Sequence, residues 1–405
     1  GYNISNEKFW QPIKPVISNL KIRGSWGLVG NDATNAGRFA YMEDLVLGGS
    51  DSYTTGIRQD TYYSGPSWNR YFNPDLTWEV GEKINLGLDL QLFNDFNLTF
   101  DIFREKRRDI FMTRENSIPE IVGTGETKIT SNNGEMENKG LDLAIDYNKQ
   151  ITKDFFLSFK STLTFARNKV LKMDEPPYFE YPGLSDVGHP LGTYWGYVAD
   201  GLFPDQETID NSPRQDLGYT PQPGDIKYVN QPNAKGEYDN VINSNDRVAI
   251  GHPYDPELVY GFGPSMKWKN WDFSFFFQGV ARTSFMMYGM HPFGTTSIKN
   301  MLQFVADDHW SVDNPNPNAA YPRLTKDSNG NNDQYSTYWL RNAAFLKLKN
   351  AEIGYTYKGM RFYLSGVNLL TFSPFKHWDP EMGGGNGLYY PTQRVFNIGF
   401  QMTIQ

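Results

Sequence analysis

The stretch INLGLDLQL, Ile84–Leu92, decides the fold of this protein. A large apolar residue stands at every second position, and Asn, Gly, Asp or Gln stands between. A period of two is that of a β-strand, whose side chains alternate between two faces. Leu98, Phe100 and Ile102 continue the alternation after Asn94-Asp95, a pair that suits a tight turn. The region is therefore predicted to be a β-hairpin.

The same alternation recurs along the whole chain and predicts an all-β, antiparallel protein. Leu141 to Tyr147, Phe155 to Phe165, Phe273 to Phe277 and Phe396 to Ile404 repeat it. About ten strands are expected from the period. Their predicted ranges are 19–29, 79–93, 96–110, 137–150, 154–169, 257–269, 271–284, 343–357, 360–370 and 394–404.

The connections between these strands fall into two alternating classes. Short links at 94–95, 149–153, 269–270 and 358–359 alternate with long ones at 30–78, 111–136, 170–256, 285–342 and 371–393. Outer-membrane barrels have short turns on one side and long loops on the other. Strands of 10 to 15 residues also have the length needed to cross a bilayer at a tilt. A transmembrane β-barrel is thus favoured over the alternative, a soluble sandwich, in which a second sheet would cover the apolar face.

Composition excludes several classes of protein. The 405 residues contain no Cys, which removes disulfides, thiolate nucleophiles and zinc–thiolate sites. The net charge of -8 argues against a nucleic-acid-binding surface. Residues 1–10 lack the basic and apolar regions of a signal peptide, which indicates either an intracellular chain or a natural start that has been removed.

Aromatic residues gather near the predicted strand ends. In a barrel they would form girdles at the two lipid–water interfaces; the alternative is that aromatic residues simply favour strands. The residues concerned are Trp78, Phe93, Tyr147, Trp268, Trp271, Tyr355, Tyr357 and Phe372.

No enzyme chemistry is predicted. No two of the five histidines have ligand spacing, and neither a nucleophile elbow nor a phosphate loop is present. We therefore expect no catalytic residue, metal or cofactor. The basic run Arg104-Glu105-Lys106-Arg107-Arg108 ends a predicted strand. It would hold lipopolysaccharide phosphates or a negative membrane surface, or it is a hydrated strand end.

Substrate contacts are expected in the long connections. Sugars stack on Trp and Tyr rings, so Tyr194, Trp195 and Tyr197 in the longest connection are the candidate substrate-binding residues. Tyr62, Tyr63 and Trp68 form a second aromatic group. Peptides use a similar wet cavity, so the sequence does not distinguish a glycan from a peptide substrate.

Several segments, in order along the chain, resemble the C-terminal part of SusC/RagA-type TonB-dependent outer-membrane transporters. They begin with the strand-and-turn at 20–31 and the run NPDLTWE that leads into the strand at Asn85. The others are NGEMENKG at 133–140, GYVADGLF at 196–203, PGDIKY at 223–228, Asn245-Asp246-Arg247, Val367-Asn368-Leu369 and Asp379-Pro380-Glu381.

The resemblance implies a barrel of about 22 strands, plugged at its lumen, of which residues 1–405 would form the C-terminal part. The plug domain, the TonB-contact segment and the first strands are expected upstream. The resemblance further implies a Gram-negative outer membrane, contact with its lipid and lipopolysaccharide, and loops at the cell surface. A SusD-like surface lipoprotein and the TonB complex are the implied partners. Import of oligosaccharides or oligopeptides is the implied function.

Two departures from the family pattern carry expectations of their own. Residues 230–236 stand where a calcium-like acidic loop is common, but they lack acidic residues, and Asp239 and Asp246 alone do not make an oxygen cage. We expect no calcium there. The chain ends Thr403-Ile404-Gln405 and not in an aromatic residue, although the alternation still places Ile404 outward.

Two other functions remain open at this stage. The first is an independent ten-stranded outer-membrane barrel enzyme, which would need paired acid and base residues on its lumen face. The second is a soluble glycan-binding β protein, against which the apolar side chains from Ile84 to Leu92 argue.

Overall fold

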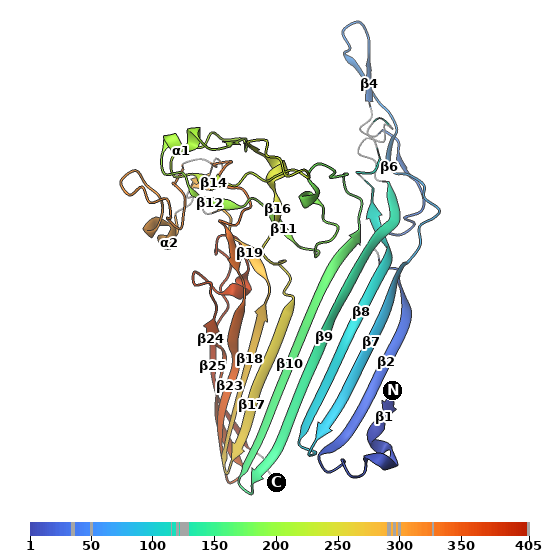
Figure 1. The fold of residues 1–405 in the computed structure, drawn as a ribbon, viewed down its shortest axis with the longest axis vertical. Coiled ribbons are helices and arrows are strands. Elements are labelled where there is room, and N and C mark those ends of the chain that lie inside the picture. Colours follow the sequence, from blue (N-terminus) through green and yellow to red (C-terminus); the bar gives the residue numbers. More distant parts are fainter. Residues whose placement is uncertain are drawn as a thin grey trace.

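One antiparallel sheet of eleven strands dominates the computed structural model (Figure 1). The structure describes residues 1–33, 37–48, 52–114, 116–118, 121, 129–289, 293–294, 297–298, 301–325 and 328–402. The strand order is β1-β2-β7-β8-β9-β10-β17-β18-β23-β24-β25, so each strand of the sheet pairs with the next one along the chain. An up-and-down sheet of this kind is the wall of a barrel.

The ten predicted strands are confirmed, and one short strand of the large sheet was missed. Ten of the eleven strands lie at the predicted places and agree with the alternation; the eleventh, β1 (Tyr2–Asn3), is two residues long and too short to show a period. The others are β2 (Ile17–Asn31), β7 (Glu79–Leu92), β8 (Phe96–Thr113), β9 (Thr130–Thr152), β10 (Phe155–Lys172), β17 (Leu258–Trp268), β18 (Trp271–Ala281), β23 (Phe345–Tyr357), β24 (Met360–Phe372) and β25 (Val395–Met402).

Strands β8 and β9 run further than the alternation predicts. Pairing continues as far as Thr113 opposite Thr130, beyond irregularities between Arg107 and Phe111. Asp109 adopts a left-handed conformation there, with φ of 58°, and its carbonyl accepts a hydrogen bond from Asn132 Nδ2 at 2.8 Å. A bulge shifts the alternation, so the sequence pattern fades although the strand continues. The predicted outward place of Ile404 lies outside the described residues.

The connections are sorted by length as predicted. Within the eleven-stranded sheet, the hairpin turns of two or three residues lie at one end, which we call the short-turn end, and the long connections lie at the other, the long-loop end (Figure 1). Left-handed residues close the short turns: Phe93 and Asn94 after β7, Lys269 after β17, and Lys358 and Gly359 after β23. Such residues give the backbone twist that two-residue hairpins require.

The two faces of the sheet differ in polarity. One face, the apolar face, carries the alternating residues such as Trp26, Leu86 and Ile398, which are 67%, 51% and 89% exposed. Large side chains so exposed over a whole sheet face need an apolar environment. The other face, the polar face, carries ion pairs such as Arg23 with Asp89 and with Asp101.

Predicted girdle residues gather at the short-turn end of the apolar face. Trp268 pairs with Trp271 and Trp271 with Tyr355, whose ring centroid is 4.8 Å away. Tyr147 of β9 lies opposite Phe96, the first residue of β8. These four rings therefore lie where an interfacial aromatic belt is expected.

Among the described residues, the long connections contain the remaining strands and both α-helices. A hairpin projects from the β2–β7 side and consists of β3 (Asp44–Val46), β4 (Ser52–Thr55), β5 (Thr61–Ser64) and β6 (Ser67–Arg70) (Figure 1). The others are β11 (Tyr194–Gly196), β12 (Ala199–Leu202), α1 (Gln206–Asp210), β13 (Arg214–Gln215), β14 (Ile226–Tyr228), β15 (Val241–Ile242), β16 (Val248–Ile250), β19 (Ser284–Met286), β20 (Phe293–Gly294), β21 (Ser297–Ile298), α2 (Gln303–Asp307) and β22 (Leu340–Asn342). Neither α1 nor α2, nor any other helix within the described ranges, has the length and apolar character to cross a membrane.

Candidate functional site

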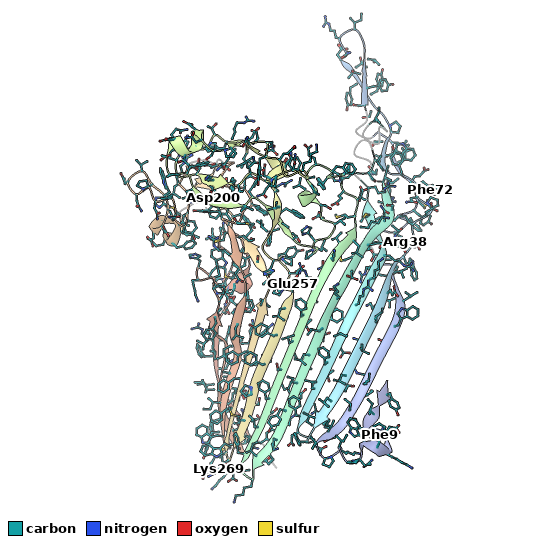
Figure 2. The ribbon with its side chains drawn as sticks, viewed as in Figure 1. Phe9, Arg38, Phe72, Asp200, Glu257 and Lys269 are labelled. Carbon is teal, nitrogen blue, oxygen red and sulfur yellow. The ribbon has the colours of Figure 1, made fainter. Side chains whose placement is uncertain are left out.

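Three of the long connections pack into a single unit at the long-loop end. We call this the loop unit; it is made by the described residues of 173–257, 282–344 and 373–394, and Asp200 is labelled within it in Figure 2. Its core is apolar and buried. The core residues are Tyr197, Leu202, Ile226, Tyr228, Ile242, Ile250, Phe285, Met286, Met287, Val305, Trp310, Ala319, Tyr321, Trp339, Ala343 and Phe375. Because all three connections contribute, they hold one another in place.

Asp225 forms the polar centre of the loop unit. Its carboxylate is fully buried and accepts hydrogen bonds from Arg323 Nε at 2.7 Å, Asn332 Nδ2 at 2.8 Å and Asn329 Nδ2 at 3.0 Å. The backbone N–H of Gln222 donates to its other oxygen at 2.8 Å. A buried charge is tolerated only when it is paired and hydrogen-bonded in this way. Asp225 therefore ties residues 222–225 to residues 323–332.

A cavity of about 290 Å³ lies beside this centre. Its walls combine the aromatic residues Tyr321 and Trp339 with polar Arg323, Asn329 and Asn332. This volume is at the lower end of the range of small-ligand pockets, roughly 300–1,000 Å³. Tyr321 and Trp339 are also core residues, 2% and 7% exposed, and the three polar residues are bound to Asp225. A ligand such as a sugar ring or a peptide side chain would therefore meet only the small parts of these side chains that stay open to the cavity.

The structure separates the three predicted substrate-binding residues. Tyr197 is only 3% exposed and packs on Tyr228, with ring centroids 5.2 Å apart, so its ring is covered and belongs to the core. Tyr194 and Trp195, both in β11, are half-buried. Trp195 Nε1 donates to Asp186 Oδ1 at 2.7 Å, and its ring meets His189 edge-on. A substrate role for Tyr194 and Trp195 stays a prediction.

The second aromatic group lies elsewhere. Tyr62 and Tyr63 belong to β5 and Trp68 to β6, in the projecting hairpin, and the loop unit stands apart from it (Figure 1). Tyr63 stacks on Tyr53 with centroids 5.2 Å apart. Tyr62, at 63% exposure, faces solvent. The structure therefore does not bring the two predicted aromatic groups to one site.

Sequence reasoning missed the residues that line the cavity. Tyr321-Pro322-Arg323 and Asn329 to Trp339 stand in a long polar connection without any period. Their only sequence signal is an aromatic residue within an Asn-rich stretch. Such a signal does not show that Arg323 meets Asp225 across 98 residues of chain.

A charged cluster joins the loop unit to the sheet. Lys347 of β23 is fully buried, and its Nζ lies 2.6 Å from Asp379 Oδ2 and 2.5 Å from Glu381 Oε2. Lys349 Nζ reaches the other oxygen of Glu381 at 2.5 Å. Burial is the largest single influence and would raise the pKa of both carboxyls, but the hydrogen bonds from Lys347 and from other neighbours, together with the nearby positive charge, hold each pKa below its ordinary value. We call these four residues the Lys347 cluster.

The stretch that departs from the calcium-like pattern is held by Asp246. Its carboxylate accepts hydrogen bonds from the backbone N–H groups of Gln231 and Asn243, both at 2.7 Å. Burial raises the pKa of Asp246. Within the described ranges, no three His, Asp or Glu side chains come together as a metal-binding group. The absence of calcium stays a prediction.

The chain is similar to known TonB-dependent receptors over its whole length. The model of the TonB dependent receptor-like β-barrel matches residues 18–369. TonB-dependent receptor P26 of Formosa agariphila is 28% identical over 100% of this chain and 41% of its own length. TonB-dependent receptor SusC of Bacteroides thetaiotaomicron is 28% identical over 99% of this chain and 39% of its own length. The chain thus spans about two fifths of these relatives.

Solved structures agree on the fold. The RagAB peptide transporter superimposes with a TM-score of 0.72 at 21% identity, over 99% of this chain and 42% of that chain. The "open-open" state of the RagAB peptide importer gives 0.74 at 21% identity, over 100% and 42%. These relatives are receptors and transporters and not enzymes, as the sequence predicts. Since the family model covers most of the sheet and the loop unit, the chain belongs to the TonB dependent receptor-like β-barrel family.

Proposed function

We propose that these residues are the C-terminal part of the barrel of an outer-membrane importer of oligosaccharides or oligopeptides. The supporting observation is the sheet itself: eleven antiparallel strands with one exposed apolar face, one ion-paired face, and connections sorted by length. In this assignment the apolar face contacts lipid and the polar face lines a plugged lumen. The plug, the TonB-contact segment and further strands precede residue 1.

The proposed partners follow from the same assignment. The long-loop end faces the cell exterior, where a SusD-like surface lipoprotein closes over the loop unit. The TonB complex acts through the upstream part and supplies the energy for import. The RagAB structure is named as a peptide transporter, whereas the name of SusC states no substrate, so both substrate classes are retained.

Substrate contact is assigned to the loop unit. Tyr194 and Trp195 present half-buried rings on it, and the cavity beside Asp225 adds Tyr321, Trp339 and Arg323. Aromatic rings with hydrogen-bonding neighbours bind both sugars and peptides.

The test is uptake by whole cells. A strain lacking the full gene is grown on individual glycans and on defined oligopeptides as limiting nutrient, and the gene is then restored. We expect growth on one substrate class to fail and to return with the gene. Unchanged growth and unchanged uptake of every labelled substrate would contradict an import function, as would a full gene that encodes no plug upstream.

A further inference from the structure

Strand alternation divides the basic run 104–108 between the two faces of the sheet. Arg104, Lys106 and Arg108 have the same parity as Ile102 and lie on the apolar face, whereas Glu105 and Arg107 lie on the polar face. There Arg107 Nη2 lies 2.9 Å from Glu105 Oε1, so the two side chains form an ion pair. The run therefore places three cationic side chains on the apolar face.

Strand register places two further cations beside Arg104. Arg104 of β8 lies opposite Lys139 of β9, and Lys139 lies opposite Arg167 of β10. Neighbouring strands are about 5 Å apart, so three cations stand side by side over roughly 10 Å. We call Arg104, Lys139 and Arg167 the cation row.

On the apolar face, the cation row lies next to a row of apolar side chains, on the side toward the long-loop end. The row two residues nearer the short-turn end is Ile102, Leu141 and Phe165, which pair in the same way and are all apolar. The boundary between hydrocarbon and charge is therefore sharp on these three strands. It lies near Glu257, which Figure 2 labels just before β17 begins, at the long-loop end of the sheet.

Positive charge exceeds negative charge at this boundary. The next row toward the long-loop end consists of Lys106, Glu137 and Lys169. The cation row and this row together hold five cations and one carboxylate. Glu82, opposite Lys106 on β7, and Glu135 and Glu257 add three carboxylates, and Arg282, which also pairs with Glu257, adds one cation. Six cations against four carboxylates leave two positive charges. Like charges directly opposite each other destabilise a sheet.

The side chains of the cation row are ordered and accessible. They are 56%, 67% and 53% exposed for Arg104, Lys139 and Arg167. Glu137 contacts Arg104 Nε at 2.6 Å and Lys139 Nζ at 3.3 Å. Glu257, almost fully buried, holds Arg167 Nε at 3.1 Å. Their carboxylates orient the cations without covering them.

We propose that the cation row binds a phosphate group of lipopolysaccharide in the outer leaflet. Such a phosphate sits on the sugar that carries the acyl chains, at the depth where the Ile102 row gives way to the cation row. The guanidinium groups of Arg and the ammonium group of Lys bind phosphate oxygens through charge-assisted hydrogen bonds. This inference rests on the proposed placement, with the apolar face in lipid and the long-loop end outside.

The experiment measures binding of lipid A to the full-length transporter in detergent. Fluorescent lipid A with its phosphate is compared with the same lipid A after phosphatase treatment. The triple variant Arg104→Gln, Lys139→Gln, Arg167→Gln is expected to bind phosphorylated lipid A about tenfold or more weakly, since each charge-assisted bond is lost. Dephosphorylated lipid A is expected to bind wild type and variant alike.

A matched control removes the same charge elsewhere. Lys83 and Lys160 lie on the polar face and Lys269 in a short turn, so Lys83→Gln, Lys160→Gln, Lys269→Gln should bind like wild type. If the triple variant folds poorly, the single variant Lys139→Gln, which changes only an exposed side chain, should still bind phosphorylated lipid A more weakly than wild type. Lys139→Arg keeps the charge and should retain binding. Displacement by millimolar inorganic phosphate would mean a free-anion site and would overturn the proposal.

Equal binding of phosphorylated lipid A by the triple variant and the control would also overturn it. Cell fractionation distinguishes this failure from failure of the proposed function. If the transporter is found in the outer membrane and lipid A binding is insensitive to the cation row, only the inference fails. If the transporter is absent from the outer membrane, the placement itself is wrong.

Discussion

Arg23 of β2 reaches across β7 to Asp101 of β8, with Arg23 Nη2 2.8 Å from Asp101 Oδ2. Gly87 lies between them in the same row of the sheet, paired with Arg23 on one side and Asp101 on the other. A Cβ at Gly87 would stand 2.8 Å from Arg23 Cζ and 2.5 Å from Asp101 Oδ1. The absence of a side chain at Gly87 is what lets one guanidinium bind carboxylates on two further strands.

Gly87→Val is predicted to break this connection. Overpacking of this kind costs about 1–3 kcal/mol, and Arg23 would also lose Asp101. The midpoint of unfolding in urea, followed by heat-modifiable gel mobility of the full-length barrel, should fall. Gly27→Val in β2 is the control, because a Cβ at Gly27 meets nothing within 4 Å. Equal midpoints for the two variants would contradict the steric role of Gly87.

Lys347→Met is predicted to release the connection between β24 and β25. Removing one partner of a buried ion pair costs about 3–5 kcal/mol, because the remaining charges stay partly buried and unpaired. A spin label at Tyr390→Cys, a side chain 80% exposed, should become more mobile. Lys160→Met, on an exposed lysine of the polar face, is the control. An unchanged spectrum for Lys347→Met would argue against the cluster as an anchor.

The Lys347 cluster is predicted to open in acid. The pKa values of Asp379 and Glu381 lie below their ordinary values of 3.8 and 4.5, so the detached connection binds more protons than the docked one in that range. Stability from the cluster is therefore complete above about pH 4.5 and is lost as the pH falls through the lowered values. The same spin label should gain mobility below pH 3.8 in wild type. Lys347→Met should lack this transition.

Asp225→Asn is predicted to loosen the loop unit. The guanidinium of Arg323, whose side chain is 17% exposed, would lose its counter-ion, at a cost of about 3–5 kcal/mol. Hydrogen exchange of residues 215–228 and 323–333 should speed up together. Asp200→Asn removes an exposed partner of Lys227. It should change the free energy of local opening, measured by hydrogen exchange, by less than about 1 kcal/mol. Exchange that is equal in the two variants would contradict a central role for Asp225.

Trp195→Ala and Tyr197→Ala are predicted to fail in different ways. Trp195 is half-buried, so its loss should raise the KM of uptake while the amount of transporter in the membrane stays the same. Tyr197 is buried, so truncating its ring costs about 3–5 kcal/mol and should lower the amount of folded transporter. Trp195→Phe keeps the ring and should restore much of the uptake. An unchanged KM in Trp195→Ala would remove Trp195 from the substrate site.

Sequence alone determined the sheet of this protein. The period of two holds wherever one strand face is apolar and the other polar, which is why ten strands from β2 to β25 and the sorting of their connections were predictable. The sequence also identified the basic run Arg104 to Arg108 at the end of a predicted strand. The pattern weakened only where a bulge at Asp109 shifted the alternation of β8.

Tertiary structure decided everything that depends on contacts between distant segments. The loop unit has no period, because its short strands and turns are held by Asp225 with Arg323 and by Lys347 with Asp379, pairs far apart in the chain. Burial placed Tyr197 in a core that the sequence presents as a polar loop. Register between three strands aligned Arg104, Lys139 and Arg167, since hydrogen bonding across strands, and not order along them, sets which side chains become neighbours.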